Sequence, residues 1–310
     1  MSEQNWERSL IENLATEALK EQRRRRRWGI FFKFLGIAYV GAFFWIMWSG
    51  RSPDGVDGGP HTAVIEIDGV IASNTPASAA RVNTALREAF KSESVKGVIL
   101  KINSPGGSPV QAGAIYDEIR RLKASKPSLP VYAVVEELCA SGGYYVAAAA
   151  DKIYVDKASL VGSIGVVMDG FGFTDAMQKF GVERRVYTAG DNKAFLDPFS
   201  PSVPRHVDHA NAMLQEIHAQ FIDAVRKGRG KRLKESADTF SGLVWTGSRS
   251  IELGLADATG TVTSVARDVI KAEKMNDYTQ REPAFERFAR RLGGVAAEAF
   301  SEALVETRFR

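Results

Sequence analysis

The sequence has 310 residues, of which 45% are hydrophobic and 25% charged, and these fractions exclude disorder as the dominant state. Its formal net charge of +4 lies mainly in the first 50 residues, and the rest of the chain is close to neutral. Nucleic-acid binding needs clustered cations, so we expect no nucleic-acid partner. The single cysteine, Cys139, excludes an intramolecular disulfide.

An apolar run of about twenty residues begins at Trp28, and as a helix it matches the thickness of a bilayer core. A block of five arginines, residues 23–27, directly precedes it, whereas the flank after it is mixed in charge. The positive-inside rule therefore predicts a cytoplasmic segment over 1–27, an anchor over 28–49, and everything beyond residue 50 on the outer side of the cytoplasmic membrane. No clear Ala-x-Ala site follows, which favours an uncleaved anchor over a signal peptide.

Residues 50–60 are rich in Gly, Pro and Asp and are typical of a flexible linker. A folded domain is expected over 61–274. Short β-rich runs alternate there with helical patterns, which predicts βαβ units and an α/β fold with parallel strand pairing. The expected strands are 63–68, 97–103, 131–136, 153–155, 161–168 and 182–188, and the expected helices between them are 79–91 and 110–123. The tail 275–310 either docks on the domain or is a solvated terminus.

One long amphipathic helix is expected over 204–229, with an apolar face that packs within the domain or against another subunit. Met213, Ile217, Phe221 and Val225 recur on that face at a spacing of four. The same helix carries His206 and His209, but no third ligand has a spacing suited to a metal ion. We therefore expect neither a metal site nor a cofactor.

Three glycine-bearing turns, 103–108, 140–143 and 161–165, each follow a predicted strand. In the second turn Ser141 is followed by two glycines, which let a substrate carbonyl approach the backbone closely. Amide groups at Gly106, Gly107 and Gly142 are candidate donors to an oxyanion. A phosphate-binding loop is not indicated, because neither of the glycine patterns typical of such loops follows a strand.

A serine nucleophile needs a base, and none of the four histidines is flanked by apolar or glycine-rich pocket sequence. Lys193 is the better candidate. A lysine acts as a general base only when it is neutral, which requires burial away from water, and residues 194–196 could form an apolar wall. The Ser163 hydroxyl is a plausible partner that orients the amine.

These motifs, in this order, resemble the signal peptide peptidase A family of Ser/Lys proteases in its short, membrane-anchored form. The resemblance covers residues 63–271 and rests on the blocks 103–107, 140–145, 162–165, 190–198, 246–247 and 254–257. It implies a crotonase- or Clp-protease-like βαβ superhelical domain. It also implies Ser141 as nucleophile, Lys193 as general base, Ser163 as the residue that orients the lysine, and an oxyanion site at Gly106, Gly107 and Gly142. In short relatives an Asp frequently follows the lysine, and Ala194 stands there in this chain.

The resemblance further implies signal peptides as substrates, with misfolded exported proteins as a second class. It implies a ring-shaped homo-oligomer in which the dyad is completed across subunit boundaries. Two other functions remain open from the residues alone. One is an acyl-CoA enzyme on the crotonase fold, since glycine turns also suit thioesters, and the other is a noncatalytic membrane scaffold.

Overall fold

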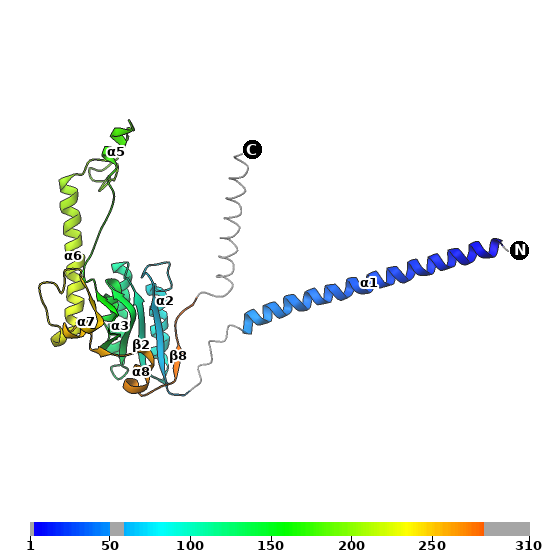
Figure 1. Cartoon of the computed structure of the whole chain (residues 1–310), viewed down its shortest axis with the longest axis horizontal. Coiled ribbons are helices and arrows are strands. Elements are labelled where there is room, and N and C mark those ends of the chain that lie inside the picture. Colours follow the sequence, from blue (N-terminus) through cyan, green and yellow to red (C-terminus); the bar gives the residue numbers. More distant parts are fainter. Residues whose placement is uncertain (1–2, 50–58, 282–310) are drawn as a thin grey trace. The chain divides into compact units, whose positions relative to one another are not determined.

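The computed structural model describes residues 3–49 and 59–281 (Figure 1). The chain divides into two units, one containing the N-terminal helix and one containing an α/β domain, and each is described by itself. Nearly all of the predicted linker 50–60 lies outside the described residues, and so does the predicted tail 275–310 from residue 282 onward.

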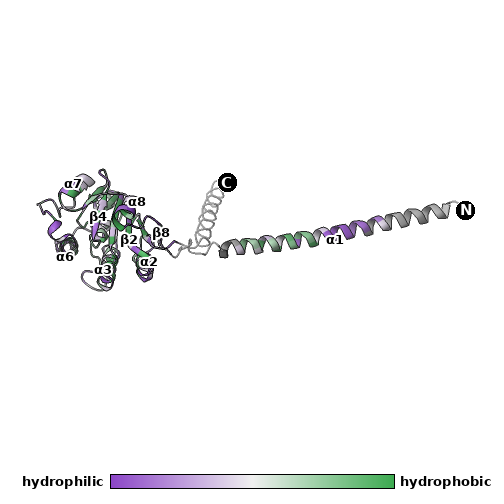
Figure 2. Cartoon of the chain, turned by 90° about the horizontal axis from the view of Figure 1, so that it is seen from below, coloured by the Kyte–Doolittle hydropathy of each residue, from purple (hydrophilic) through white to green (hydrophobic). Residues whose placement is uncertain are grey.

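Helix α1 (Glu3–Ser49) contains the stretch Lys20–Trp45, which is long and apolar enough to cross a membrane. It is the one such helix in the described part of the chain. Figure 2 shows a hydrophilic part around the arginine block and a more hydrophobic part towards the helix's C-terminal end. None of the apolar window is buried by protein, and Phe34 and Trp45 are 69% and 72% exposed. This composition suits a helix surrounded by lipid.

The domain is built on an eight-stranded, mainly parallel sheet with the main strand order β6-β5-β3-β2-β1-β8. Its long central strands are β1 (His61–Asp68), β2 (Val95–Ser104) and β3 (Val131–Ala140). Strand β3 pairs with β4 through its first half and with β5 through its last residues. The remaining strands are short: β4 (Lys152–Val155), β5 (Leu160–Gly162), β6 (Val244–Thr246), β7 (Ala258–Thr259) and β8 (Met275–Asp277). The predicted alternation of strands and helices with parallel pairing is confirmed.

Helices pack on both faces of this sheet. The larger core contains helices α2 (Ala79–Lys91), α3 (Pro109–Ser125) and α4 (Gly142–Ala147). A smaller core on β2, β3 and β4 is closed by α8 (Val262–Ser264) and the π-helix η2 (Val265–Ile270). Helix α7 (Gly247–Glu252) follows β6. Cys139 is fully buried in the larger core, and burial raises the pKa of its thiol well above the usual range.

Helix α6 (Pro204–Arg229) has the predicted bounds, and all but one of its buried residues lie in its C-terminal half. Phe221 and Val225 are buried there, whereas Val207 near the other end is exposed. The segment 166–203, here called the arm, leads out to α5 (Thr174–Lys179) and back to the start of α6 (Figure 1). Packing of the helix face within the domain is therefore confirmed for its C-terminal half, and a contact of the other half with a second subunit stays a prediction.

Two strand predictions in the arm region are wrong. The strand expected over 161–168 ends at Gly162, where φ values of 121° at Gly162 and 50° at Ser163 turn the chain out of the extended conformation. No strand forms over 182–188, because within residues 59–281 no neighbouring strand lies alongside to supply hydrogen bonds.

A buried ion pair ties the end of α6 to the sheet. Arg229, only 1% exposed, donates from Nη1 to Oδ2 of Asp257 over 2.7 Å and from Nε to the Gly254 carbonyl over 2.8 Å. The same Asp257 oxygen accepts from the Ile153 amide of β4. Burial alone would raise the pKa of Asp257, but the Arg229 hydrogen bond and charge outweigh it and hold the pKa below its ordinary value.

We expect Arg229→Met to lower the free energy of unfolding by about 2 kcal/mol at neutral pH, because it removes the buried partner of Asp257 and leaves that carboxylate with only the partly exposed Arg232, at 3.1 Å. The loss should shrink as the pH falls below 3.8, the ordinary value for Asp257, since the carboxylate then becomes protonated. Urea unfolding of the detergent-purified chain measures both effects. Arg226→Met, which removes an exposed pair with Glu235, is the control and should change little. Equal losses in the two variants would refute the conclusion that the buried Arg229–Asp257 pair stabilises the fold.

Candidate active site

The three glycine-bearing turns meet at one edge of the sheet. They follow β2, β3 and β5, which are neighbours in the strand order and pair in parallel. Carboxyl ends of parallel neighbouring strands lie at the same edge, so the turns after them are brought together. The fold thus gathers residues that are up to about sixty positions apart in the sequence.

Ser141 and Ser163 both occupy an unusual backbone conformation. Their φ angles are 51° and 50°, a region that residues other than glycine seldom adopt. Each turn is held by a backbone hydrogen bond: the Ser141 amide donates to the Gly162 carbonyl over 2.9 Å, and the Ser163 amide donates to the Leu243 carbonyl over 2.7 Å. Such strain persists where the surrounding structure enforces it, and it concentrates at functional sites.

The first two turns approach each other so closely that only glycine fits. A Cβ atom on Gly106 would lie 2.6 Å from the Gly142 amide nitrogen and 2.7 Å from the Ser141 Cβ. A Cβ atom on Gly107 would lie 2.3 Å from the Ile71 carbonyl oxygen. The two glycines also have φ values of 100° and 147°. Steric exclusion and backbone conformation therefore both require glycine at these positions.

The three candidate oxyanion donors are not equivalent. The Gly106 amide donates to the Ser104 hydroxyl over 3.1 Å, and that hydroxyl in turn donates to the Gly69 carbonyl over 2.6 Å. The amides of Gly107 and Gly142 have no hydrogen-bond partner within residues 59–281. Gly142 is the first residue of α4, where amide groups lack an intrahelical acceptor. Gly107 and Gly142 are thus the donors left open to a ligand.

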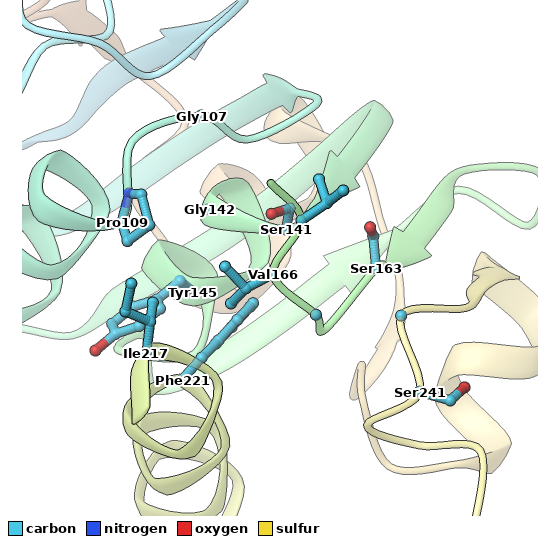
Figure 3. A pocket seen from close by; sticks show the side chains of 13 residues that line it. Gly107, Pro109, Ser141, Gly142, Tyr145, Ser163, Val166, Ile217, Phe221 and Ser241 are labelled. Atoms are coloured by element: carbon cyan, nitrogen blue, oxygen red, sulfur yellow. The ribbon is translucent and has the colours of Figure 1, made fainter. Parts of the chain in front are cut away.

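A cavity of about 380 Å³ opens beside Ser141 (Figure 3). Its apolar side brings together α4, α6 and the start of the arm, and the Tyr145 and Phe221 rings stack at 4.8 Å. Ser141 and Ser163 both line it. The full lining is Gly107, Pro109, Ser141, Gly142, Tyr145, Ser163, Gly165, Val166, Val167, Ile217, Phe221, Ser241 and Gly242. No histidine, lysine or carboxylate belongs to this lining.

Lys193 does not line the cavity. It is exposed, in the returning part of the arm, where its amide donates to the Gly190 carbonyl. Neighbouring Asn192 accepts a 3.3 Å hydrogen bond from His206 near the start of α6. His206 precedes Ile217, which does line the cavity, by eleven residues, or about 16 Å along the helix. Ser141 and Lys193 are therefore not brought together within one chain.

The expected apolar wall does not enclose Lys193 within its own chain. The Phe195 ring packs instead against His206 and His209, with centroid separations of 5.3 and 5.7 Å. Leu196 is 39% exposed. In the described part of the chain, no group of three or more His, Cys, Asp or Glu side chains is arranged to hold a metal ion.

Several cavity residues were not singled out from the sequence as site residues. Tyr145 belongs to the Ser-Gly-Gly-Tyr-Tyr block, and Ile217 and Phe221 belong to the predicted apolar face of the long helix, so their types and spacing carried a signal. Ser241 and Gly242 come from an irregular loop with no motif of its own.

Comparison with known proteins identifies the family. Residues 123–276 match the model of peptidase family S49, and this region contains Ser141, Ser163 and Lys193. A protein of Enterococcus faecium that carries the signal peptide peptidase SppA name is 31% identical over 63% of this chain and 56% of its own length. Protease 4 of Haemophilus influenzae is 30% identical over 70% of this chain and 35% of its own length.

A further relative is named for a different activity. The Na(+)/H(+) antiporter NhaA of Brucella melitensis is 48% identical over 59% of this chain, but the match covers only 25% of that protein. The chain therefore spans about a quarter to just over half of these relatives. The family model and the two peptidase-named relatives agree with the resemblance inferred from the motifs, and the chain belongs to peptidase family S49.

Proposed function

We propose that this chain is a serine peptidase in which Ser141 is the nucleophile. The observation that carries the proposal is the conformation of Ser141: a strained serine opens onto a cavity beside two amides that lack partners within residues 59–281. A substrate carbonyl bound there would place its developing negative charge between the Gly107 and Gly142 amides. Membership of a peptidase family supports the same chemistry.

The base would come from a second copy of the chain. The cavity of one chain contains a serine but no lining side chain able to accept its proton near neutral pH. Lys193 is exposed in the arm, beside the end of α6 that is remote from the cavity, which suits a group presented to a neighbour. Docking would also remove its amine from water, as a neutral lysine requires. Ser163, which lines the same cavity, would orient the amine.

The arm supplies a surface for such docking. Phe171, Phe180 and Tyr187 are 78%, 84% and 90% exposed on it, a density of aromatic surface that a monomer rarely leaves in water. A contact in which one copy gives the serine and the next gives the lysine is head-to-tail, and repetition of such a contact closes into a ring when the rotation allows. We therefore propose a ring-shaped homo-oligomer.

In this mechanism the neutral Lys193 amine of one copy takes the proton of Ser141 Oγ, and the oxygen attacks the peptide carbonyl. The tetrahedral oxyanion accepts hydrogen bonds from Gly107 and Gly142. The resulting ammonium then protonates the departing amine as the C–N bond breaks and leaves an acyl-serine. Water, deprotonated by the same lysine, hydrolyses this ester and regenerates the serine.

Signal peptides are the proposed substrates, with misfolded exported proteins as a second class. An apolar cavity wall formed by Val166, Ile217 and Phe221 suits apolar side chains. The anchor in α1 keeps the domain near the membrane in which such peptides are left, and the arginine block before it favours a cytoplasmic N-terminus and a domain on the outer side. A relative named a signal peptide peptidase supports this substrate class.

The two alternatives lack a supporting feature. An acyl-CoA enzyme of this fold would need a carboxylate in place of the lysine base, and the cavity lining contains none. A noncatalytic scaffold gives no reason for a strained serine next to two open amides.

Subunit mixing tests the shared dyad. Ser141→Ala and Lys193→Ala should each abolish hydrolysis of a peptide ester. Random co-assembly of the two variants should restore about a quarter of wild-type activity, since that share of adjacent pairs joins an intact serine to an intact lysine. Lys179→Ala, which removes another exposed arm lysine, should stay active. A mixture without activity would contradict the shared dyad, and an active single variant would contradict the chemistry.

A glycine substitution tests the oxyanion site. Gly106→Ala should slow labelling of Ser141 by a fluorophosphonate at least about 100-fold, because its methyl group would displace the Gly142 amide. Gly113→Ala, at a helical glycine with no atom within 4 Å of the added carbon, is the matched control and should label normally. Equal labelling of both variants would remove Gly142 from the site.

Protease protection tests the orientation. Trypsin added to intact spheroplasts should digest the domain while a tag before residue 3 stays protected, because the arginine block holds that end in the cytoplasm. Immunoblotting against the tag and the domain gives the readout. Digestion of the domain only after lysis of the spheroplasts would reverse the proposed orientation.

A further inference from the structure

The turn that carries Ser163 needs support from outside its own residues. Its backbone is strained at Ser163, and the Gly165 amide closes it by donating to the Ser163 carbonyl over 2.9 Å. On one side, the Ser163 amide is held by the carbonyl of Leu243. The side chain of Ile164 is fully buried, which leaves the carbonyl of that residue as the polar group that needs a donor.

His218 of α6 supplies that donor. Its Nε2 lies 3.1 Å from the Ile164 carbonyl oxygen, and because a carbonyl only accepts, Nε2 carries the proton. The neutral tautomer with Nε2–H and the imidazolium can both make this bond. Within residues 59–281 it is the one side-chain hydrogen bond made to the backbone of residues 162–165. The ring is half-buried and has no other hydrogen bond among these residues.

We propose that His218 is a positioning residue for catalysis, acting through the Ser163 turn; this inference rests on the proposed function. The same helix contributes Ile217 and Phe221 to the cavity wall (Figure 3), so His218 fixes the turn relative to the surface that contacts substrate. Without the bond the strained turn relaxes, and the Ser163 hydroxyl moves from the place where it orients the lysine amine. Small displacements of such groups lower the rate of the chemical step more than they weaken binding.

The full chain, purified in detergent, tests this role by steady-state hydrolysis of a peptide ester. His218→Leu should lower kcat about tenfold and leave KM within about twofold, as expected for the loss of one orienting hydrogen bond. His218→Gln, whose amide nitrogen reaches the position of Nε2, should restore kcat to within about threefold of wild type. Gln215→Leu, an exposed polar-to-apolar change on the same helix, is the matched control and should behave as wild type.

A chain that already carries Ser163→Ala distinguishes a positioning role of His218 from a general effect on stability. If His218 acts through Ser163, then His218→Leu should lower kcat less than about twofold in a chain that already carries Ser163→Ala. Should the leucine variant fail to fold, as judged by gel filtration, His218→Asn replaces it, since its shorter side chain leaves the Ile164 carbonyl out of reach. Asparagine and glutamine variants then differ only in reach.

Three results would overturn the inference: unchanged kcat in the leucine or asparagine variant, no rescue by glutamine, or a tenfold loss that persists in the Ser163→Ala background. A wild-type chain that neither hydrolyses the ester nor labels at Ser141 would instead overturn the proposed function and this role with it. The two failures are therefore distinguishable by the wild-type measurement alone.

Discussion

The close approach of the Gly106 turn to the Ser141–Gly142 turn is the constraint on which the candidate site depends. With less than 3 Å between a would-be Cβ on Gly106 and the Gly142 nitrogen, the two loops are in backbone contact. That contact exists because β2 and β3 run parallel and, after a shift in register beyond Ile102, pair Ser104 with Cys139, so that both strands end at the same level. Ser104 then fixes the first loop by linking the Gly106 amide to the Gly69 carbonyl after β1. Three strands therefore determine the position of one serine.

The same architecture keeps the two residues of the proposed dyad, Ser141 and Lys193, apart in a single chain. Helix α6 reaches the cavity with Ile217 and Phe221, whereas its opposite end holds the segment around Lys193 through His206. Helix α6 thus contacts both the cavity and the segment around Lys193, at positions that are about three helical turns apart. A helix of this kind cannot fold back on itself, so proton transfer to Lys193, as proposed, requires a neighbouring copy. The exposed aromatic side chains of the arm agree with that requirement.

The sequence predicted the regular part of the fold well, because strand and helix periodicities there reflect local burial. The bounds of α2 and α6 agree with prediction, and the three glycine turns do follow strands. It failed over 182–188, where β-branched residues predict a strand but no neighbouring strand supplies hydrogen bonds. The sequence paired Ser141 with Lys193 from the motifs alone. The distance between them depends on the path of the arm, and the arm sequence has no hydrophobic periodicity that would predict this path. His218 likewise had no sequence signal, since its role comes from a carbonyl 54 positions away.

The complete burial of Cys139 has a practical consequence for distance measurements on this protein. The chain's only sulfhydryl lies in the core with a raised pKa, so it is protected from maleimides and methanethiosulfonates. A cysteine introduced on α5, or at the rim of the cavity, would be the sole reactive thiol. Spin labels could then be attached at one chosen point per subunit without replacing any native residue, and the separations between subunits could be read directly from their dipolar coupling.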